Sequence, residues 1–499
     1  MKGSLGKRVV HSSAWIYARV LVTNLFNLFV VAILARKLHP AEFGLVALAS
    51  VVLQFLTTLG PAGIGDFVVY DRKEGWQERV HAAFWLNIAL TLAATGVCAA
   101  LVPLVSLFYH MAGLRPILYA FLARFALGQL GVVPDALLRR ELNFKALSLR
   151  EMALATVTGA AMVVMALGGC GVWSLVLPSV VVTPVSVWIA FRLAKWSPTL
   201  PLRRKMWPGI CRYSFHTMGA AFVTLVGNEG DTLLVGKRLG ATELGFYNQA
   251  WTSANLVNRN VTGVVSKVAM PALSAVSQDM ARLRAALNRM LSLLALVSFP
   301  LLIGMFVVAD LFVVTLYGPQ WGPSVLPLQI LIIFALRQTV GSPTTVIFNV
   351  VGRPDVAFKM GLFFLPFYAL SIWLGCHWGI VGVAAGVTIA RTAYGMIQFA
   401  VIARLVGQTF RDLLAPMAQP LMAATIMGVL VFGCRLLLSS LGISGPVLLL
   451  ALIPIGGLIW LVLLLRVFTR SLEEMLQVCD ALSSPLGARV RRTIEPMMA

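Results

Sequence analysis

Charged residues are scarce in this sequence. Asp, Glu, Lys and Arg make up 12% of its 499 residues, whereas soluble domains usually carry about 25%. Hydrophobic residues make up 59%, and the mean hydropathy is +0.87. One soluble core cannot bury so much apolar surface, and a disordered chain would need far more charge. The sequence therefore excludes soluble, fibrous and disordered proteins and predicts an all-α integral membrane protein.

Acidic residues are scarcer than basic residues. The chain has 19 Asp and Glu against 40 Lys and Arg, which gives a formal net charge of +21. A charge of this size can indicate a nucleic-acid partner. Here, however, the basic residues mostly separate long apolar runs, a pattern typical of membrane topology signals. We therefore expect no nucleic-acid partner.

Signatures of enzyme chemistry are also missing. The six cysteines have no CxxC spacing and no histidine at zinc-site spacing, so we expect no metal, haem or disulfide framework. The segment from Gly230 to Lys237 departs from the P-loop pattern, and HExxH, GxSxG and kinase motifs do not occur. The sequence thus predicts no enzyme, no ATP site and no cofactor. Energy for transport would come from an ion gradient, another subunit or the concentration difference of the substrate.

Apolar stretches of bilayer-crossing length recur along the whole chain. We predict about fourteen transmembrane helices joined by short connectors, at 13–35, 43–66, 81–108, 115–137, 150–169, 172–194, 213–236, 244–270, 287–316, 324–350, 356–377, 379–403, 412–438 and 445–467. Lys and Arg concentrate in alternate connectors, as the positive-inside rule requires. This bias predicts a multi-pass protein with both termini in the cytoplasm.

Two segments of the sequence repeat each other. ILARKLHPAEFGLVALA (Ile33–Ala49) aligns with LVGKRLGATELGFYNQA (Leu234–Ala250), which places Gly44 over Gly245, and a shorter FALxQ match follows in the same order. Because six predicted spans separate the copies, both halves share one orientation, as in transporters whose substrate site lies between parallel repeats. The expected organisation is a six-helix bundle at 1–200, a second at 201–408, accessory helices at 409–468 and a cytoplasmic tail at 469–499.

Three segments carry a family resemblance: NEGDTLLVGKRLGATELGFYNQAW (Asn228–Trp251), PALSAVSQD (Pro271–Asp279) and LLRRELNFKALSLRE (Leu137–Glu151). They resemble the polysaccharide branch of the multidrug/oligosaccharidyl-lipid/polysaccharide (MOP) exporter superfamily, and in particular the Wzx-type lipopolysaccharide and exopolysaccharide repeat-unit flippases. The resemblance implies two six-helix bundles in a V around a central cavity. It also implies alternating-access transfer of an undecaprenyl-diphosphate-linked glycan from the cytoplasmic to the periplasmic leaflet of the bacterial inner membrane. Membrane lipids, a polysaccharide polymerase and the export machinery are the implied partners.

Six cations fall inside predicted spans: Arg19, Arg124, Arg259, Lys267, Arg337 and Arg391. Each costs about 2.5 to 3.5 kcal/mol at a helix centre, so together they favour a wet interior that binds a diphosphate through guanidinium groups. Arg259 lies on a polar helical stripe, at steps of three and four. We predict these substrate-binding residues: Arg259, Arg19, Arg337, Arg124, Arg391, Asn27, Asn255, Thr252 and Asn228. Alternatively, Arg19 and Lys267 snorkel to a membrane surface, and Arg124, Arg337 and Arg391 pair with carbonyls or acids.

Three acids are candidates for coupling transport to H⁺ or Na⁺. Glu229 and Asp231 fall near the outer part of the span at 213–236, and Asp310 falls in the outer half of the span at 287–316. A carboxylate within a membrane can carry a proton or bind a cation. Ion pairs with Lys237 or with an intramembrane arginine are the equally open alternative.

Other functions remain as alternatives. A lipid II flippase of the same fold is chemically similar, and only the wording of the motifs favours a glycan repeat unit. An ion-coupled drug exporter is disfavoured, because a carrier of organic cations should have an acidic or aromatic lumen. A membrane polysaccharide polymerase or ligase would need a larger loop to organise its chemistry than any connector here provides.

Overall fold

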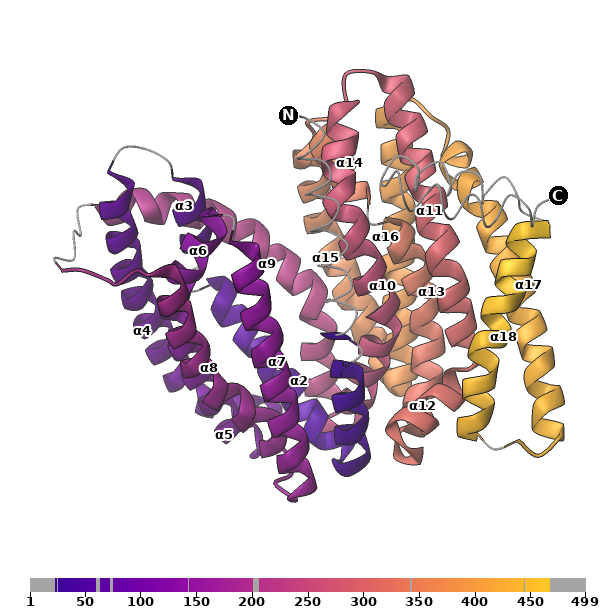
Figure 1. Cartoon of the computed structure of the whole chain (residues 1–499), viewed down its shortest axis with the longest axis horizontal. Helices are drawn as coiled ribbons and strands as arrows, with labels where there is room; N and C mark the ends of the chain where they lie inside the picture. Colours follow the sequence, from indigo (N-terminus) through magenta and orange to yellow (C-terminus); the bar gives the residue numbers. More distant parts are fainter. Residues whose placement is uncertain are drawn as a thin grey trace. The chain divides into compact units, whose positions relative to one another are not determined.

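The computed structural model shows a protein built of helices (Figure 1). It describes residues 23–466, apart from 25, 60–62, 72–74, 142, 201–205, 342 and 444. At some helical positions, chiefly 212–224 and 261–272, only the backbone is described. Arg19 therefore lies outside the described residues, as does the side chain of Lys267.

The helices lie where the apolar runs predict them. The α-helices are α2 (Pro40–Leu59), α3 (Ile64–Tyr70), α4 (Trp76–Tyr109), α5 (Leu114–Gln129), α6 (Val132–Arg140), α7 (Phe144–Leu167), α8 (Trp173–Ala194), α9 (Trp207–Arg238), α10 (Ala241–Ala275), α11 (Met280–Val307), α12 (Ala309–Tyr317), α13 (Val325–Gly341), α14 (Pro343–Val350), α15 (Pro354–Gly375), α16 (Gly379–Val406), α17 (Phe410–Ser440) and α18 (Gly445–Arg466). Two short 3₁₀ helices are η2 (Pro319–Ser324) and η3 (Cys376–Trp378). The structure divides several predicted spans, for example into α5 and α6 or α11 and α12.

Several of these helices are suited to a bilayer. By length and composition, eight segments of the described chain can cross a membrane, or nine if α5 and α6, which meet at a bend of 43°, form one span. One of the eight, Pro354–Val406, contains both α15 and α16, which pack against each other. The chain is thus a multi-pass membrane protein, and the count of fourteen spans stays a prediction.

The chain forms two compact units. Residues Val22–Asn248 form one unit, and the other includes the chain from Gln249 onward, so that the boundary falls inside α10. Within the first unit, α9 packs along α2 and also contacts α3 and α4. The sequence analysis places this helix in the second bundle. The expected domain limits at 200, 408 and 468 stay predictions.

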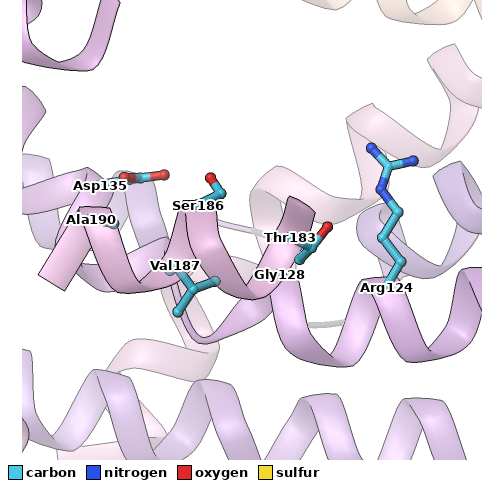
Figure 2. Close-up of a pocket in the computed structure, with 8 residues that line it drawn as sticks. Arg124, Gly128, Asp135, Thr183, Ser186, Val187 and Ala190 are labelled. Carbon is cyan, nitrogen blue, oxygen red and sulfur yellow. The ribbon is translucent and has the colours of Figure 1, made fainter. Parts of the chain in front are cut away.

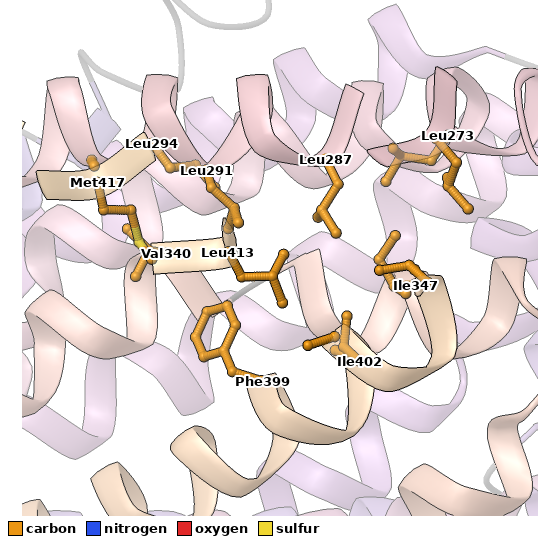
Figure 3. Packing of buried hydrophobic residues seen from close by; sticks show 14 of the residues in the cluster. Leu273, Leu287, Leu291, Leu294, Val340, Ile347, Phe399, Ile402, Leu413 and Met417 are labelled. Atoms are coloured by element: carbon orange, nitrogen blue, oxygen red, sulfur yellow. The ribbon is translucent and has the colours of Figure 1, made fainter. Parts of the chain in front are cut away.

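A large apolar cluster organises the second unit. Leu287, Leu291 and Leu294 of α11 face Leu413 and Met417 of α17, and residues of α13, α14 and α16 complete the cluster (Figure 3). Lipid tails are as apolar as leucine, so close packing rather than water exclusion holds such helices together in a bilayer. The helix starts are fixed locally, because Asp279 caps α11 and Thr409 with Asp412 forms a capping box on α17. This frame positions α13 and α16.

Small residues bring α15 and α16 unusually close. A Cβ added at Gly382 would lie 2.3 Å from the carbonyl oxygen of Gly375, and one at Gly386 would lie 2.6 Å from that of Ser371. Only glycine allows two backbones to approach in this way, which is the usual device of membrane helix pairs. The glycines therefore fix α16 against α15.

The repeat-related glycines touch each other within the first unit. A Cβ at Gly44 would lie 1.8 Å from the carbonyl oxygen of Ala241, and a Cβ at Gly245 would lie 1.9 Å from that of Pro40. Gly44 and Gly245 are 201 positions apart, and so are Pro40 and Ala241. The contact is thus reciprocal, as expected when two copies of an element meet at a local two-fold axis.

Candidate functional site

Two of the predicted arginines lie close together in the second unit. Arg337 projects from α13 and Arg391 from α16, and these helices pack along each other. The two guanidinium groups are near enough to repel each other electrostatically. The structure thus brings together two cations that are 54 positions apart in sequence.

Aromatic rings surround Arg391, which is only 9% exposed. Its Nη2 donates a 2.6 Å hydrogen bond to the hydroxyl oxygen of Tyr368 on α15. Its guanidinium carbon lies 4.6 Å from the ring centre of Tyr368, 5.1 Å from that of Trp251 and 5.5 Å from that of Phe334. Cation–π attraction of this kind stabilises a guanidinium more strongly when water is excluded. The rings therefore hold Arg391 in one orientation.

Arg337 has fewer partners. It lies 5.6 Å from the ring centre of Phe334, and its Nε atom is buried without a hydrogen-bond partner. It forms no ion pair with any residue that the structure describes. Room for its guanidinium comes from Gly395, where an added Cβ would lie 2.0 Å from Nη1. Arg337 is thus a half-buried cation with no ion-pair partner among the residues that the structure describes.

The chemistry of this cluster suits an anion. Two like charges in a low-dielectric setting are costly unless an opposite charge joins them. A guanidinium presents a planar fork that matches phosphate oxygens bidentately. The rings around Arg391 shield its guanidinium from solvent, and Arg337 lies beside one of them, Phe334. The Arg337–Arg391 site is therefore suited to a phosphate group.

Arg124 lies in the first unit, away from this pair in sequence and on a different helix. It is half-buried on α5 and lines a cavity of about 220 Å³ with residues of α6 and α8 (Figure 2). No described residue forms a hydrogen bond or an ion pair with its guanidinium. Its surroundings are polar, unlike the aromatic surroundings of Arg391.

The other predicted contact residues have varied environments. Arg259 is exposed on α10 and makes no hydrogen bond or ion pair within the described chain, whereas Asn255, one turn earlier, is buried and donates to the carbonyl oxygen of Trp251. Thr252 is half-buried, and Asn27 and Asn228 are exposed. The polar stripe of α10 thus includes both buried and exposed positions, and the roles of its members stay predictions.

The three candidate coupling acids also differ. Asp310 accepts hydrogen bonds of 2.8 and 2.5 Å from both terminal nitrogens of Arg435, which also donates to the carbonyl oxygen of Val307 at the end of α11. Asp231 is buried and accepts a 2.7 Å hydrogen bond from the hydroxyl of Tyr247. Glu229 is half-buried. Within the described chain, no group of three or more His, Cys, Asp or Glu side chains is placed to hold a metal.

The sequence analysis missed the aromatic part of the site. Tyr394 follows Arg391 by three residues, stacks on Phe364 at 4.3 Å and interacts electrostatically with Arg337. The 3-residue spacing places Tyr394 next to Arg391 on the helix surface, and this was the available signal. Tyr368 had no such signal, because it comes from another helix.

Solved structures show the fold. The inward-closed lipid II flippase MurJ superimposes with a TM-score of 0.69 at 16% identity, covering 92% of this chain and 99% of that one. An inward-facing multidrug-resistance MATE transporter of the MOP superfamily gives a TM-score of 0.61 at 15% identity, covering 77% and 94%. The chain therefore has the fold of these transporters.

Sequence comparisons identify the family. The succinoglycan biosynthesis transport protein ExoT of Rhizobium meliloti is 27% identical, over 97% of this chain and 98% of its own length. The lipopolysaccharide biosynthesis protein WzxC of Escherichia coli is 23% identical, over 84% and 85%. The teichuronic acid biosynthesis protein TuaB of Bacillus subtilis is 22% identical, over 95% and 99%. These relatives confirm the resemblance to the polysaccharide branch of the MOP exporters. Because residues 33–326 match the model described as "Polysaccharide biosynthesis protein", the chain belongs to that family.

Proposed function

We propose that this protein is a flippase that moves undecaprenyl-diphosphate-linked oligosaccharide repeat units from the cytoplasmic to the periplasmic leaflet of the inner membrane. It acts by alternating access and supplies surface polysaccharide. The Arg337–Arg391 pair is the observation that carries the proposal, because a buried guanidinium among aromatic rings with a second, half-buried guanidinium near it suits a diphosphate. The names of the relatives, which concern succinoglycan, lipopolysaccharide and teichuronic acid, support a glycan cargo.

The test is leaflet transfer in liposomes. The full chain is reconstituted with an isotopically labelled undecaprenyl-diphosphate oligosaccharide, and transfer to the opposite leaflet is measured. Arg337→Gln and Arg391→Gln keep a polar side chain and remove the charge, so each should lower transfer at least tenfold if it holds the diphosphate. Arg282→Gln is a matched control, because Arg282 is an exposed arginine at the start of α11. Full transfer by both site variants would refute the role of the pair.

Competition distinguishes the main alternatives. Excess unlabelled repeat-unit lipid, excess lipid II and excess organic cations are each added to the same assay, and uptake of the organic cations is measured as well. A glycan flippase should be inhibited most by its own repeat-unit lipid, since that lipid offers both the diphosphate and the sugars. Stronger inhibition by lipid II would favour the lipid II flippase, and transport of organic cations would favour a drug exporter.

We further propose that transport is coupled to H⁺ or Na⁺ and that Asp231 binds the coupling ion. It is buried, and its side-chain partner is the hydroxyl of Tyr247 rather than a cation. Asp310, by contrast, is occupied by Arg435. Asp231→Asn should remove any stimulation of transfer by an imposed pH or Na⁺ gradient while leaving transfer without a gradient. Stimulation that survives in this variant would exclude Asp231.

The proposal also implies location and partners. The protein would lie in the inner membrane with both termini in the cytoplasm, and it would deliver its cargo to a periplasmic polysaccharide polymerase and export machinery. The excess of Lys and Arg in alternate connectors supports this orientation. Cysteine accessibility to a membrane-impermeant maleimide in intact spheroplasts tests it.

A further inference from the structure

The helices α5 and α6 are separated by a break at Gly131. α5 ends at Gln129, α6 begins at Val132, and the two meet at a bend of 43°. The buried amide of Asn87 on α4 donates a 2.7 Å hydrogen bond to the carbonyl oxygen of Gln129 and so satisfies a group that the break releases. Irregular backbone at membrane depth is tolerated where it is buried in protein or lines a wet cavity. The cavity of about 220 Å³ adjoins this break.

The lining of the cavity is unusually polar for a membrane helix bundle. Figure 2 shows Arg124, Ser186 and Asp135 extending to the same side of α8. The full set that lines the cavity is Arg124, Gly128, Gly131, Asp135, Thr183, Ser186, Val187 and Ala190. Cation, carboxylate and hydroxyl thus face one space.

Much of this hydrogen-bonding capacity is unused. Neither the guanidinium of Arg124 nor the hydroxyl of Ser186 has a hydrogen-bond partner among the residues that the structure describes. Thr183 donates to the carbonyl oxygen of Ser179 in its own helix, which leaves its oxygen able to accept. An arginine inside a membrane is costly, and such residues usually mark a substrate pathway. The cavity therefore has free hydrogen-bonding groups that can bind a polar ligand.

The carboxylate of Asp135 favours a ligand with hydroxyl groups over a bare anion. Its two oxygens accept hydrogen bonds of 2.6 and 2.9 Å from Arg150, whose side chain is 6% exposed, while that of Asp135 is 24% exposed. Asp135 thus stays in reach of a ligand and can accept further hydrogen bonds. A bare anion would be attracted by the guanidinium of Arg124 but repelled by the carboxylate of Asp135. A polyhydroxyl ring instead donates to Asp135 and accepts from Arg124.

Size points to a single ring. Pockets that enclose drug-sized ligands measure roughly 300–1,000 Å³, so a cavity of about 220 Å³ has room for one ring and not for a chain of sugars. We propose that this cavity binds one sugar residue of the lipid-linked glycan, with Arg124, Ser186 and Asp135 as its hydrogen-bonding groups. The inference rests on the proposed function and names a contact for the glycan of its substrate.

Binding of two lipids tests the inference. The full chain in nanodiscs is titrated with undecaprenyl diphosphate bearing the oligosaccharide repeat unit and with undecaprenyl diphosphate alone. Arg124→Gln should weaken binding of the glycan lipid about tenfold and Ser186→Ala about threefold, with no change for the sugar-free lipid. Ser179→Ala is the control on the same helix, because Ser179 donates to Val176 of α8 and does not line the cavity. It should bind both lipids as the unmodified protein does.

Several results would overturn the inference. If Arg124→Gln weakens binding of both lipids equally, the cavity is a phosphate site. If both variants bind the glycan lipid as the unmodified protein does, the cavity is not on the substrate path. Unmodified protein that binds both lipids equally would also exclude a sugar site. Leaflet transfer by the unmodified protein is measured separately. If no transfer occurs, the proposed function is wrong, whatever the cavity binds. Ser186→Ala removes a single oxygen, so a folding defect of Arg124→Gln does not leave the question open.

Discussion

The guanidinium of Arg337 occupies the space where a side chain at Gly395 would begin. The arginine comes from α13 and the glycine from α16, one helical turn after Arg391. Gly395 thus leaves room for the guanidinium of Arg337 beside the helix that carries Arg391. A substitution at Gly395 should therefore displace the guanidinium of Arg337 without removing its charge.

Gly395→Ala should impair function more than stability. The added methyl group meets only the flexible end of Arg337, so the guanidinium shifts and the helices need not move. We expect leaflet transfer to fall about tenfold, with a thermal midpoint in detergent within about 2 °C of the unmodified protein. Gly386→Ala is the contrast, because its methyl group meets the backbone of Ser371 and should lower the midpoint clearly. If both variants lose stability alike, Gly395 has a packing role and no special relation to Arg337.

The positions of the helices follow from the sequence for a simple reason. A span must carry about 20 apolar residues whatever its neighbours are, so Trp173–Ala194 and Phe410–Ser440 are visible in the sequence alone. Breaks within spans are less visible. Near the bend at Gly131, Asn87 from another helix donates a hydrogen bond to the carbonyl oxygen of Gln129, and Arg435 from α17 donates one to the carbonyl oxygen at the end of α11. Such long-range contacts leave no local periodicity.

The binding site was only partly predictable for the same reason. The cost of an intramembrane charge singles out Arg337 and Arg391, but it does not reveal that they lie together. Their proximity depends on glycine-mediated packing and on the rings of Tyr368 and Phe334. Arg259 was favoured because its own helix carries a polar stripe, and the structure shows it exposed. A stripe of polar residues shows that one face of a helix is polar. It does not show whether that face contacts another helix, a cavity or solvent.

Arg259→Ala tests that favoured prediction directly. Arg259 makes no hydrogen bond or ion pair with any described residue, so its removal should leave the thermal midpoint unchanged within about 2 °C. If it contacts the diphosphate during transport, export of the glycan should fall, and Arg259→Lys should restore part of it through charge alone. Cell-surface polysaccharide is measured in strains with equal membrane levels of each protein. Normal output from Arg259→Ala would remove this residue from the site.

Asp310 and Arg435 should act as a structural pair. The bidentate contact links α12 to α17, and Arg435 also holds the end of α11. Because both side chains are partly exposed, a double-mutant cycle with Asp310→Asn and Arg435→Gln should give a coupling energy of only about 1 kcal/mol. Thermal denaturation of the four proteins measures it. A coupling near zero, together with loss of gradient-driven transfer in Asp310→Asn, would instead assign Asp310 to ion coupling.

The reciprocal contact of Gly44 and Gly245 predicts matched effects. At either position an added methyl group meets a backbone carbonyl, of Ala241 or of Pro40, which cannot move without separating α2 from α10. Each alanine substitution should therefore cost about 1 to 3 kcal/mol of stability. The two costs should be similar because the contacts are equivalent, and the double variant should cost less than their sum because one separation relieves both clashes. Gly96→Ala in α4 is the control. A Cβ there meets nothing within 4 Å, so alanine should be neutral or stabilising. Clearly unequal costs at Gly44 and Gly245 would contradict a local two-fold relation between the repeats.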